Sequence, residues 1–135
     1  MILILHIILV QGGDSMAYDT RELLARLIQC EAGGEGYDGM AAVASVVINR
    51  SKVENGEFAR VSNGGDVRAI IEQPGQFTCL KTNVRGVYNS QNIYNMNPEE
   101  IHYQIADWAL LADSSGLWLN WYGEAVFTGC TPQGH

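Results

Sequence analysis

Glu31 is the residue whose type and position most clearly suggest a catalytic role. It is a carboxylate close to the end of a predicted helix. It lies four residues after Leu27, on the helix face that carries the regularly spaced apolar side chains Leu23, Leu24, Leu27 and Ile28. Periodicity leaves two interpretations of this position. Glu31 is either held against the buried face, or it emerges into solvent beside Gly33.

If Glu31 is held against the buried face, two effects raise its pKa. Desolvation disfavours the charged carboxylate, and the negative end of the helix dipole disfavours it again. A carboxylic acid that keeps its proton near neutral pH is what a general acid for glycoside cleavage requires. Under that interpretation, Glu31 is suited to act as a general acid.

Glu35 is the other acidic residue nearby. The Gly33-Gly34 pair between the two glutamates leaves the direction of the Glu35 side chain open, so it is either a second carboxylate or a loop charge. Glycosidases with two carboxylates need the second group across the sugar ring, and nothing in the sequence fixes Glu35 there. We favour a loop or supporting role for it.

The elements that must position these residues are mainly helical. Asp19 and Glu22 stand at capping-box spacing before a helix. The pattern predicts helices over Thr20–Ala32, from Met40 to about Arg50 after a start at Asp38-Gly39, from Asp66 through Ile71, and from Asn97-Pro98-Glu99-Glu100 to about Ala112. Between them, Ser51–Gly65 is expected to be a loop and residues 81–96 a long surface excursion. Leu117–Tyr122 has strand composition, with Ala125–Phe127 as a short hairpin partner.

Size and charge narrow the class of protein. A chain of 135 residues with 47% hydrophobic and 17% charged residues fits one globular domain. The net charge of -7 and the scattered lysines and arginines disfavour nucleic acid and anionic membrane surfaces as partners, whereas a glycan remains open. The first ten residues are almost wholly apolar but too short to span a bilayer. We therefore treat residues 1–15 as a leader or extension and residues 16–135 as the domain.

The cysteines do not indicate a metal site. Cys30, Cys79 and Cys130 are an odd number without C-x-x-C spacing, which argues against a zinc site and a disulfide framework. One pair plus a free thiol remains open. We expect neither a metal nor a cofactor.

Several motifs together resemble a known family. Residues 21–50, RELLARLIQCEAGGEGYDGMAAVASVVINR, are similar to the opening of the SleB and CwlJ type cell wall hydrolases, which include spore cortex-lytic enzymes active in germination. The family pattern is met by Glu31-Ala32-Gly33-Gly34-Glu35, Gly39 and Asn49-Arg50, and then by Ile71, Gln73, Pro74 and Phe77. The resemblance covers about Tyr18 to Trp118. Beyond Trp118 the sequence departs from the pattern, which indicates a truncated or divergent C-terminal part.

The resemblance implies a lysozyme-like, mainly helical α+β domain with a small β element, and it places the family's catalytic acid on Glu31. The implied substrate is peptidoglycan in cell wall or spore cortex, cleaved between N-acetylmuramic acid and N-acetylglucosamine. One carboxylate without an obvious nucleophile suits a lytic transglycosylase. The side chains that could line the sugar groove are Glu35, Gln73, Gln76, Phe77, Trp118 and Tyr122, although Phe77 and Trp118 also suit core packing and Gln73 a turn hydrogen bond.

Two rival functions remain open at this point. A cell wall peptidase would use Cys30 or Cys79 as a nucleophile with His102, although such a distant pairing is weak evidence. At the start of a helix, His102 is expected to be partly exposed. The other rival is a non-catalytic glycan-binding module, which would not need a carboxylate with a raised pKa.

Overall fold

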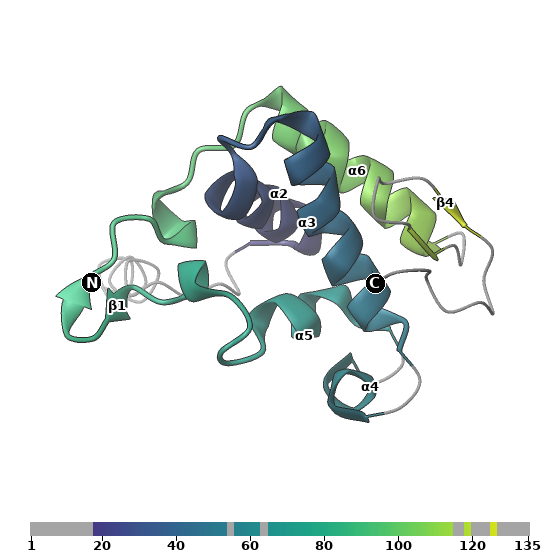
Figure 1. Ribbon diagram of the computed structural model, residues 1–135, viewed down its shortest axis with the longest axis horizontal. Helices are drawn as coiled ribbons and strands as arrows, with labels where there is room; N and C mark the ends of the chain where they lie inside the picture. Colours follow the sequence, from purple (N-terminus) through teal and green to yellow (C-terminus); the bar gives the residue numbers. More distant parts are fainter. Residues whose placement is uncertain (1–17, 54–55, 63–64, 115–117, 120–124, 127–135) are drawn as a thin grey trace, which may run out of the picture.

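The computed structural model describes residues 18–53, 56–62, 65–114, 118–119 and 125–126. The helices are α2 (Thr20–Ala32), α3 (Gly36–Ser51), α4 (Gly56–Ser62), α5 (Val67–Glu72) and α6 (Glu100–Ser114), with short 3-10 helices η2 (Thr78–Leu80) and η3 (Ile93–Asn95). The strands are β1 (Asn83–Val84), β2 (Val87–Tyr88), β3 (Trp118–Leu119) and β4 (Ala125–Val126), paired as two antiparallel sheets. The predicted mainly helical α+β class is therefore confirmed (Figure 1).

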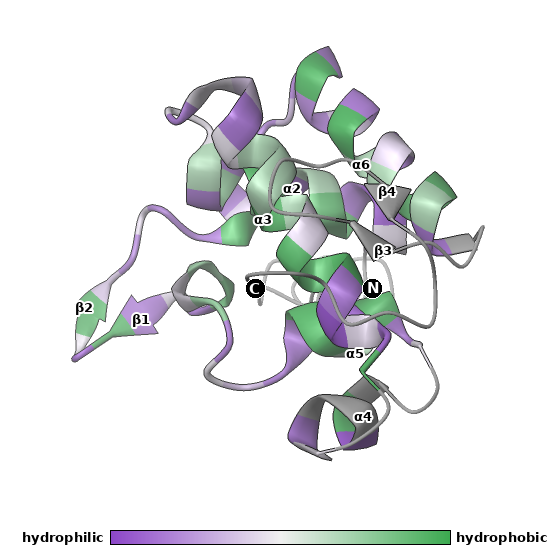
Figure 2. Cartoon of the chain, turned by 45° about the vertical axis from the view of Figure 1, so that its right-hand side comes forward, coloured by the Kyte–Doolittle hydropathy of each residue, from purple (hydrophilic) through white to green (hydrophobic). Residues whose placement is uncertain are grey.

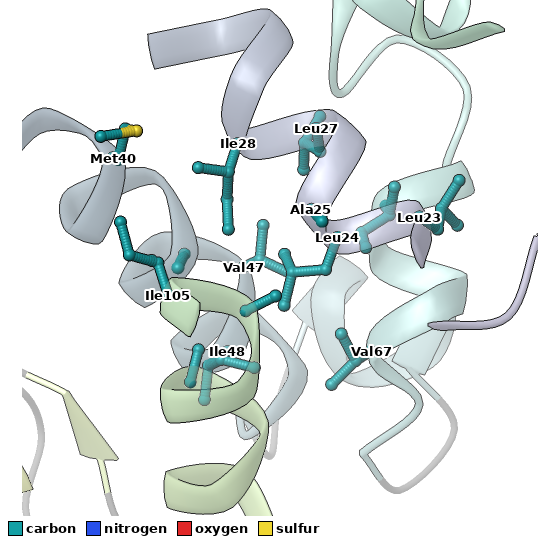
Figure 3. Packing of buried hydrophobic residues seen from close by; sticks show 14 of the residues in the cluster. Leu23, Leu24, Ala25, Leu27, Ile28, Met40, Val47, Ile48, Val67 and Ile105 are labelled. Carbon is teal, nitrogen blue, oxygen red and sulfur yellow. The ribbon is translucent and has the colours of Figure 1, made fainter. Parts of the chain in front are cut away.

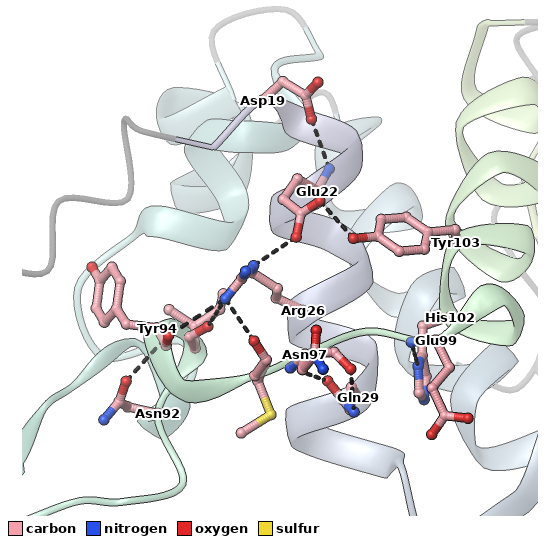
Figure 4. A network of polar contacts seen from close by, with 12 residues as sticks. Asp19, Glu22, Arg26, Gln29, Asn92, Tyr94, Asn97, Glu99, His102 and Tyr103 are labelled. Carbon is pink, nitrogen blue, oxygen red and sulfur yellow. Dashed lines mark hydrogen bonds and ion pairs between the residues drawn. The ribbon is translucent and has the colours of Figure 1, made fainter. Parts of the chain in front are cut away.

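Helix α2 has the predicted bounds. Its N-cap Asp19 accepts a hydrogen bond of 2.8 Å from the backbone N–H of Glu22, which satisfies one of the free donors of the first turn. The Glu22 carboxylate does not complete a capping box. It accepts hydrogen bonds of 2.7 Å from Arg26 and from the Tyr103 hydroxyl, and so ties α2 to α6 (Figure 4).

Helix α3 begins at Gly36, earlier than the predicted start at Met40. Gly36 has a φ of 77°, in the left-handed region that glycine adopts without steric penalty. The chain leaves α2 and enters α3 through this residue. The connection between the two helices is therefore shorter than predicted.

The expectation of a loop over Ser51–Gly65 was wrong, because this range contains α4. The helix packs against α3 and α5, and its Glu57 and Arg60 form an ion pair one turn apart. Tertiary contacts of this kind override the low helix propensity of a polar, glycine-containing segment. The prediction for α5 is confirmed, since Asp66 caps the helix by accepting from the Ala69 N–H at 3.1 Å.

Helix α6 begins at Glu100, so the predicted cap at Asn97 was wrong. The Glu99 carbonyl accepts from the backbone N–H of His102 at 3.0 Å, and the Glu99 N–H donates to His102 Nδ1 at 2.9 Å. This contact also explains why His102 is buried rather than partly exposed. Asn97 instead pairs its backbone with the side-chain amide of Gln29 in α2 (Figure 4).

Residues 81–96 form more structure than a surface excursion. A two-residue turn, Arg85-Gly86, joins β1 to β2, with both residues at positive φ as tight hairpin turns require. The excursion then returns to the domain, where Asn92 and Ile93 are buried. The β1–β2 hairpin and β4 lie at opposite ends of the molecule (Figure 1).

The predicted C-terminal hairpin is confirmed for the four residues that the structure describes there. Trp118 pairs with Val126 and Leu119 with Ala125 in the antiparallel β3–β4 ladder. Strand β3 lies against α3 and α6. The rest of the predicted pair, residues 117, 120–122 and 127, lies outside the described residues, as does the leader over residues 1–15.

The core forms where α2 and α3 pack against each other and against α5 and α6. Figure 2 shows the alternation of apolar and polar residues along these helices. The largest fully buried side chains include the predicted stripe of α2, Leu23, Leu24, Leu27 and Ile28, together with Val47, Ile48, Ile70, Ile71 and Ile105 (Figure 3). Burial of this stripe fixes α2 along its length and so fixes the position of its C-terminal turn.

Candidate active site

Glu31 lies in the last turn of α2, with its side chain exposed to solvent. It is not held against the buried face that carries Leu27 and Ile28. The helix ends one residue later, at Ala32, and the following Gly33 and Gly34 are exposed and carry no side chain that could cover the carboxylate. Of the two interpretations that the sequence leaves open, emergence at the helix end is the one observed.

Desolvation nevertheless raises the pKa of Glu31 above its ordinary value. No charged neighbour among the described residues contributes to this shift. The surrounding protein thus removes part of the hydration of the carboxyl group while leaving it accessible. A proton donor needs both properties, because it must keep its proton and also reach its substrate.

The fold brings α2 into contact with η2. A hydrogen bond to Cys30 and burial raise the pKa of Cys79, and the charge of Glu31 contributes to the same shift. Glu31 therefore lies within electrostatic reach of Cys79, which follows Phe77 by two residues. The candidate acid therefore lies near η2, the element that directly follows Gln76 and Phe77.

Gln76 and Phe77 share a contact that the sequence did not reveal. Arg50, at the end of α3, donates a hydrogen bond to Gln76 Oε1, and its guanidinium carbon lies 6.0 Å from the centroid of the Phe77 ring. Burial lowers the pKa of Arg50. Phe77 also packs against the core, so the core-packing interpretation holds for part of its surface. The Asn49-Arg50 motif was the available signal for Arg50, but it gave no role.

Gln73 occupies the C-cap of α5, and its backbone carbonyl accepts from the Gln76 N–H at 3.1 Å. The expected turn hydrogen bond is therefore present. The side-chain amide nitrogen lies 3.4 Å from Glu57 Oε2 in α4. The amide oxygen is buried and has no hydrogen-bond partner within the described part of the chain. It is an acceptor that a ligand N–H or O–H would satisfy.

Glu35 is exposed at the N-cap of α3. A Cβ atom built on Gly39 would come within 2.4 Å of Glu35 Cβ, so the missing side chain at Gly39 provides the room that Glu35 occupies. Its stem lies over the first turn of α3. This placement supports the local, supporting role that we expected, whereas a contact with substrate stays a prediction.

The side chains of the two C-terminal aromatic candidates lie outside the described part of the chain. Trp118 belongs to β3, but its side chain lies outside the description, and Tyr122 lies outside the described residues altogether. Their predicted contacts with sugar stay predictions.

His102, the partner required by the peptidase alternative, is engaged at the start of α6. Among the described residues, no group of three or more His, Cys, Asp and Glu side chains is placed to hold a metal ion. Within the same residues, no helix combines the length and apolar character needed to cross a membrane.

The sequence pattern of the family described as Cell Wall Hydrolase matches residues 34–127. The match begins after Glu31, includes the other candidate residues and continues beyond Trp118, where we expected the resemblance to end. No curated protein and no solved structure was found to match the chain. The family match covers more than half of the sequence. The chain belongs to the cell wall hydrolase family, whose substrate is peptidoglycan.

Proposed function

We propose that the protein is a lytic transglycosylase that cleaves peptidoglycan glycan strands between N-acetylmuramic acid and N-acetylglucosamine, with Glu31 as acid and then base. The observation that carries this proposal is the combination of solvent access and a pKa raised by desolvation at Glu31. Family membership supplies the substrate class. The residue and the type of cleavage are our inference.

The proposed reaction needs one carboxyl group. Protonated Glu31 gives its proton to the glycosidic oxygen, and the bond from that oxygen to C1 of the muramic acid breaks. The Glu31 carboxylate then takes the proton of the 6-hydroxyl of the same sugar while the hydroxyl oxygen attacks C1. The product is a 1,6-anhydro sugar, and Glu31 regains its proton for the next cycle.

The surroundings of Glu31 support this route over a two-carboxylate mechanism. In a retaining glycosidase the second carboxylate lies about 5 Å from the acid and would raise its pKa by charge repulsion. In the described part of the chain, the cause of the raised pKa of Glu31 is desolvation, without a contribution from a second carboxylate. A nucleophile supplied by the substrate itself needs no second acid.

Sugar binding is proposed for the segment beside Glu31. The amides of Gln73 and Gln76 suit the acetamido groups of the substrate, and the buried Gln73 oxygen supplies an unused acceptor. Arg50 holds Gln76 and faces the Phe77 ring, and so acts as a positioning residue for both. Glu35, Trp118 and Tyr122 are proposed to extend the binding surface. The catalytic domain is proposed to span residues 16–135.

The test is product analysis in water enriched in ¹⁸O. The parent protein and the Glu31→Gln variant are incubated with purified peptidoglycan, and the masses of the released muropeptides are determined by mass spectrometry. A lytic transglycosylase gives anhydro products that lack one water and carry no ¹⁸O. Glu31→Gln is expected to release these products at least about 100-fold more slowly.

Each other result rejects a defined part of the proposal. Reducing-end products that carry one ¹⁸O would identify hydrolysis and overturn the anhydro route. Cut stem peptides with intact glycan would identify a peptidase, to be checked by thiol alkylation. Binding to peptidoglycan without any product from the parent protein would identify a non-catalytic module.

A further inference from the structure

Two cysteines that are far apart in the sequence meet beside the proposed acid. Cys30 lies in the last turns of α2, directly before Glu31, and Cys79 lies in the middle of η2. The two elements are in contact, and each thiol is the largest single influence on the pKa of the other. Both cysteines are free in the structure. Cys79 is buried in the core, whereas Cys30 is partly exposed at its edge.

We propose that Cys30 and Cys79 are a modification site at which the protein forms an intramolecular disulfide between the end of α2 and η2. The location of the substrate supports the formation of a disulfide. Peptidoglycan lies outside the cytoplasmic membrane, where disulfides form and persist. The bond itself does not depend on the proposed function, but its consequence for catalysis rests on the role of Glu31.

The surroundings assign different roles to the two sulfur atoms. A hydrogen bond from Cys79 lowers the pKa of Cys30, although burial and the charge of Glu31 oppose the shift. The same hydrogen bond and burial raise the pKa of Cys79. Cys30 is the more accessible of the two and forms the thiolate more readily, so it is the attacking group.

The reaction needs a disulfide as oxidant, either a small-molecule disulfide or that of a thiol oxidoreductase. The Cys30 thiolate attacks one sulfur of the oxidant, forms a mixed disulfide and releases one thiol. Cys79 then loses its proton and displaces the second thiol. The product is the Cys30–Cys79 bond, and the two electrons and two protons leave on the two released thiols.

The contacts of Cys30 permit this change. Its thiol donates to the backbone carbonyl of Gln91 at 3.1 Å, a bond that oxidation would remove. The same carbonyl lies 3.4 Å from the side-chain amide of Asn89, so it keeps a donor. The disulfide would fasten the residue before Glu31 to the segment that carries Gln76 and Phe77.

Trypsin provides a direct test, because it places the three cysteines in three separate peptides, residues 27–50, 69–81 and 86–135. The purified chain is treated with glutathione disulfide, alkylated, digested and analysed by mass spectrometry. The expected product is peptide 27–50 joined to 69–81, lighter than their sum by two hydrogens, with Cys130 alkylated. The dithiothreitol-treated control should give three alkylated peptides.

Thermal unfolding gives an independent readout. In a Cys130→Ser background, the oxidised protein should melt on the order of 10 °C above the reduced protein, because the bond closes a long loop. The further substitution Cys79→Ser should abolish this difference. Alkylation of both cysteines after oxidation, stable glutathione adducts without a cross-link, or cross-links to 86–135 would overturn the proposal. None of these readouts uses enzyme activity, so failure here is separate from failure of the proposed function.

Discussion

At the scale of single residues, Glu31 combines exposure with partial desolvation. A fully buried carboxyl would keep its proton but could not reach a polymer outside the domain. A fully hydrated one would be ionised near neutral pH. The raised pKa must therefore also appear in the stability of the protein, because protonation is linked to folding.

The Glu31→Gln substitution should change the pH dependence of stability. The folded pKa of Glu31 is raised, so its contribution to stability is greatest below the pKa of the unfolded carboxyl, about 4.3, and is lost as pH rises through the folded pKa. Glutamine does not titrate. Relative to the parent, the variant should therefore gain melting temperature as the pH rises over the range above about pH 4. A difference that stays constant over this range would contradict the raised pKa.

Gly39 provides a second test at this scale. Alanine usually stabilises a helix relative to glycine, but a Cβ at Gly39 would meet Glu35 Cβ at 2.4 Å. Gly39→Ala should therefore lower the free energy of unfolding by about 1–3 kcal/mol, as overpacking does, measured by urea denaturation. Gly34→Ala is the matched control, since no atom lies within 4 Å of a Cβ built there. Equal effects of the two substitutions would show that the contact is not decisive.

At the scale of elements, Arg26 connects α2 to the chain around η3. Its side chain pairs with Glu22 at 2.7 Å and donates to the carbonyls of Ile93 at 3.0 Å and Met96 at 2.8 Å (Figure 4). It also lies 4.2 Å from the centroid of the Tyr18 ring. One guanidinium thus holds the end of the excursion against the helix that carries Glu31.

Arg26→Lys should lower the free energy of unfolding by about 1–3 kcal/mol, because an ammonium group cannot reproduce the planar fork and leaves carbonyl oxygens unsatisfied. Arg21→Lys is the control, since the ion pair of Arg21 with Asp107 is about half exposed on both side chains, where solvent screens it, and lysine keeps the charge. Urea denaturation of the two variants would compare them. A larger loss for Arg21→Lys would contradict this account of η3 anchoring.

The elements differ in how far the sequence predicted them. The caps of α2 and α5 are local contacts, Asp19 with Glu22 and Asp66 with Ala69, so their positions were predictable. Helix α4 was not, because it depends on packing against α3 and α5. The cap of α6 was missed because a histidine side chain, not the usual Asn, satisfies it. The exposure of Glu31 and the meeting of Cys30 with Cys79 depend on where the end of α2 lies relative to η2.

At the scale of the whole molecule, α2 is the element around which α3, α5 and α6 assemble. Its leucine and isoleucine stripe, visible in Figure 3, is fully buried. The spacing of apolar residues predicted this stripe well, because the buried face of a helix follows from the helical repeat alone. The arrangement of the helices around it, and hence the site, comes from contacts that are distant in the sequence.

Leu24→Ala should therefore lower the free energy of unfolding by about 2–5 kcal/mol through lost burial and a cavity. Leu111→Ala is the matched control, because Leu111 is 66% exposed on α6 and its truncation should change stability by about 0.5 kcal/mol or less. Chemical denaturation would measure both. Similar losses for the two substitutions would contradict the central position of α2.

The central claim is that Glu31 is the proton donor, and the most direct measurement is the rate at which Glu31→Gln releases muropeptides from peptidoglycan. We predict a loss of about 100- to 10,000-fold relative to the parent, with a melting temperature that shows the fold is intact. Glu100→Gln, an exposed glutamate at the start of α6, should keep a rate within a few-fold of the parent. A Glu31→Gln protein that works as fast as Glu100→Gln would contradict the account.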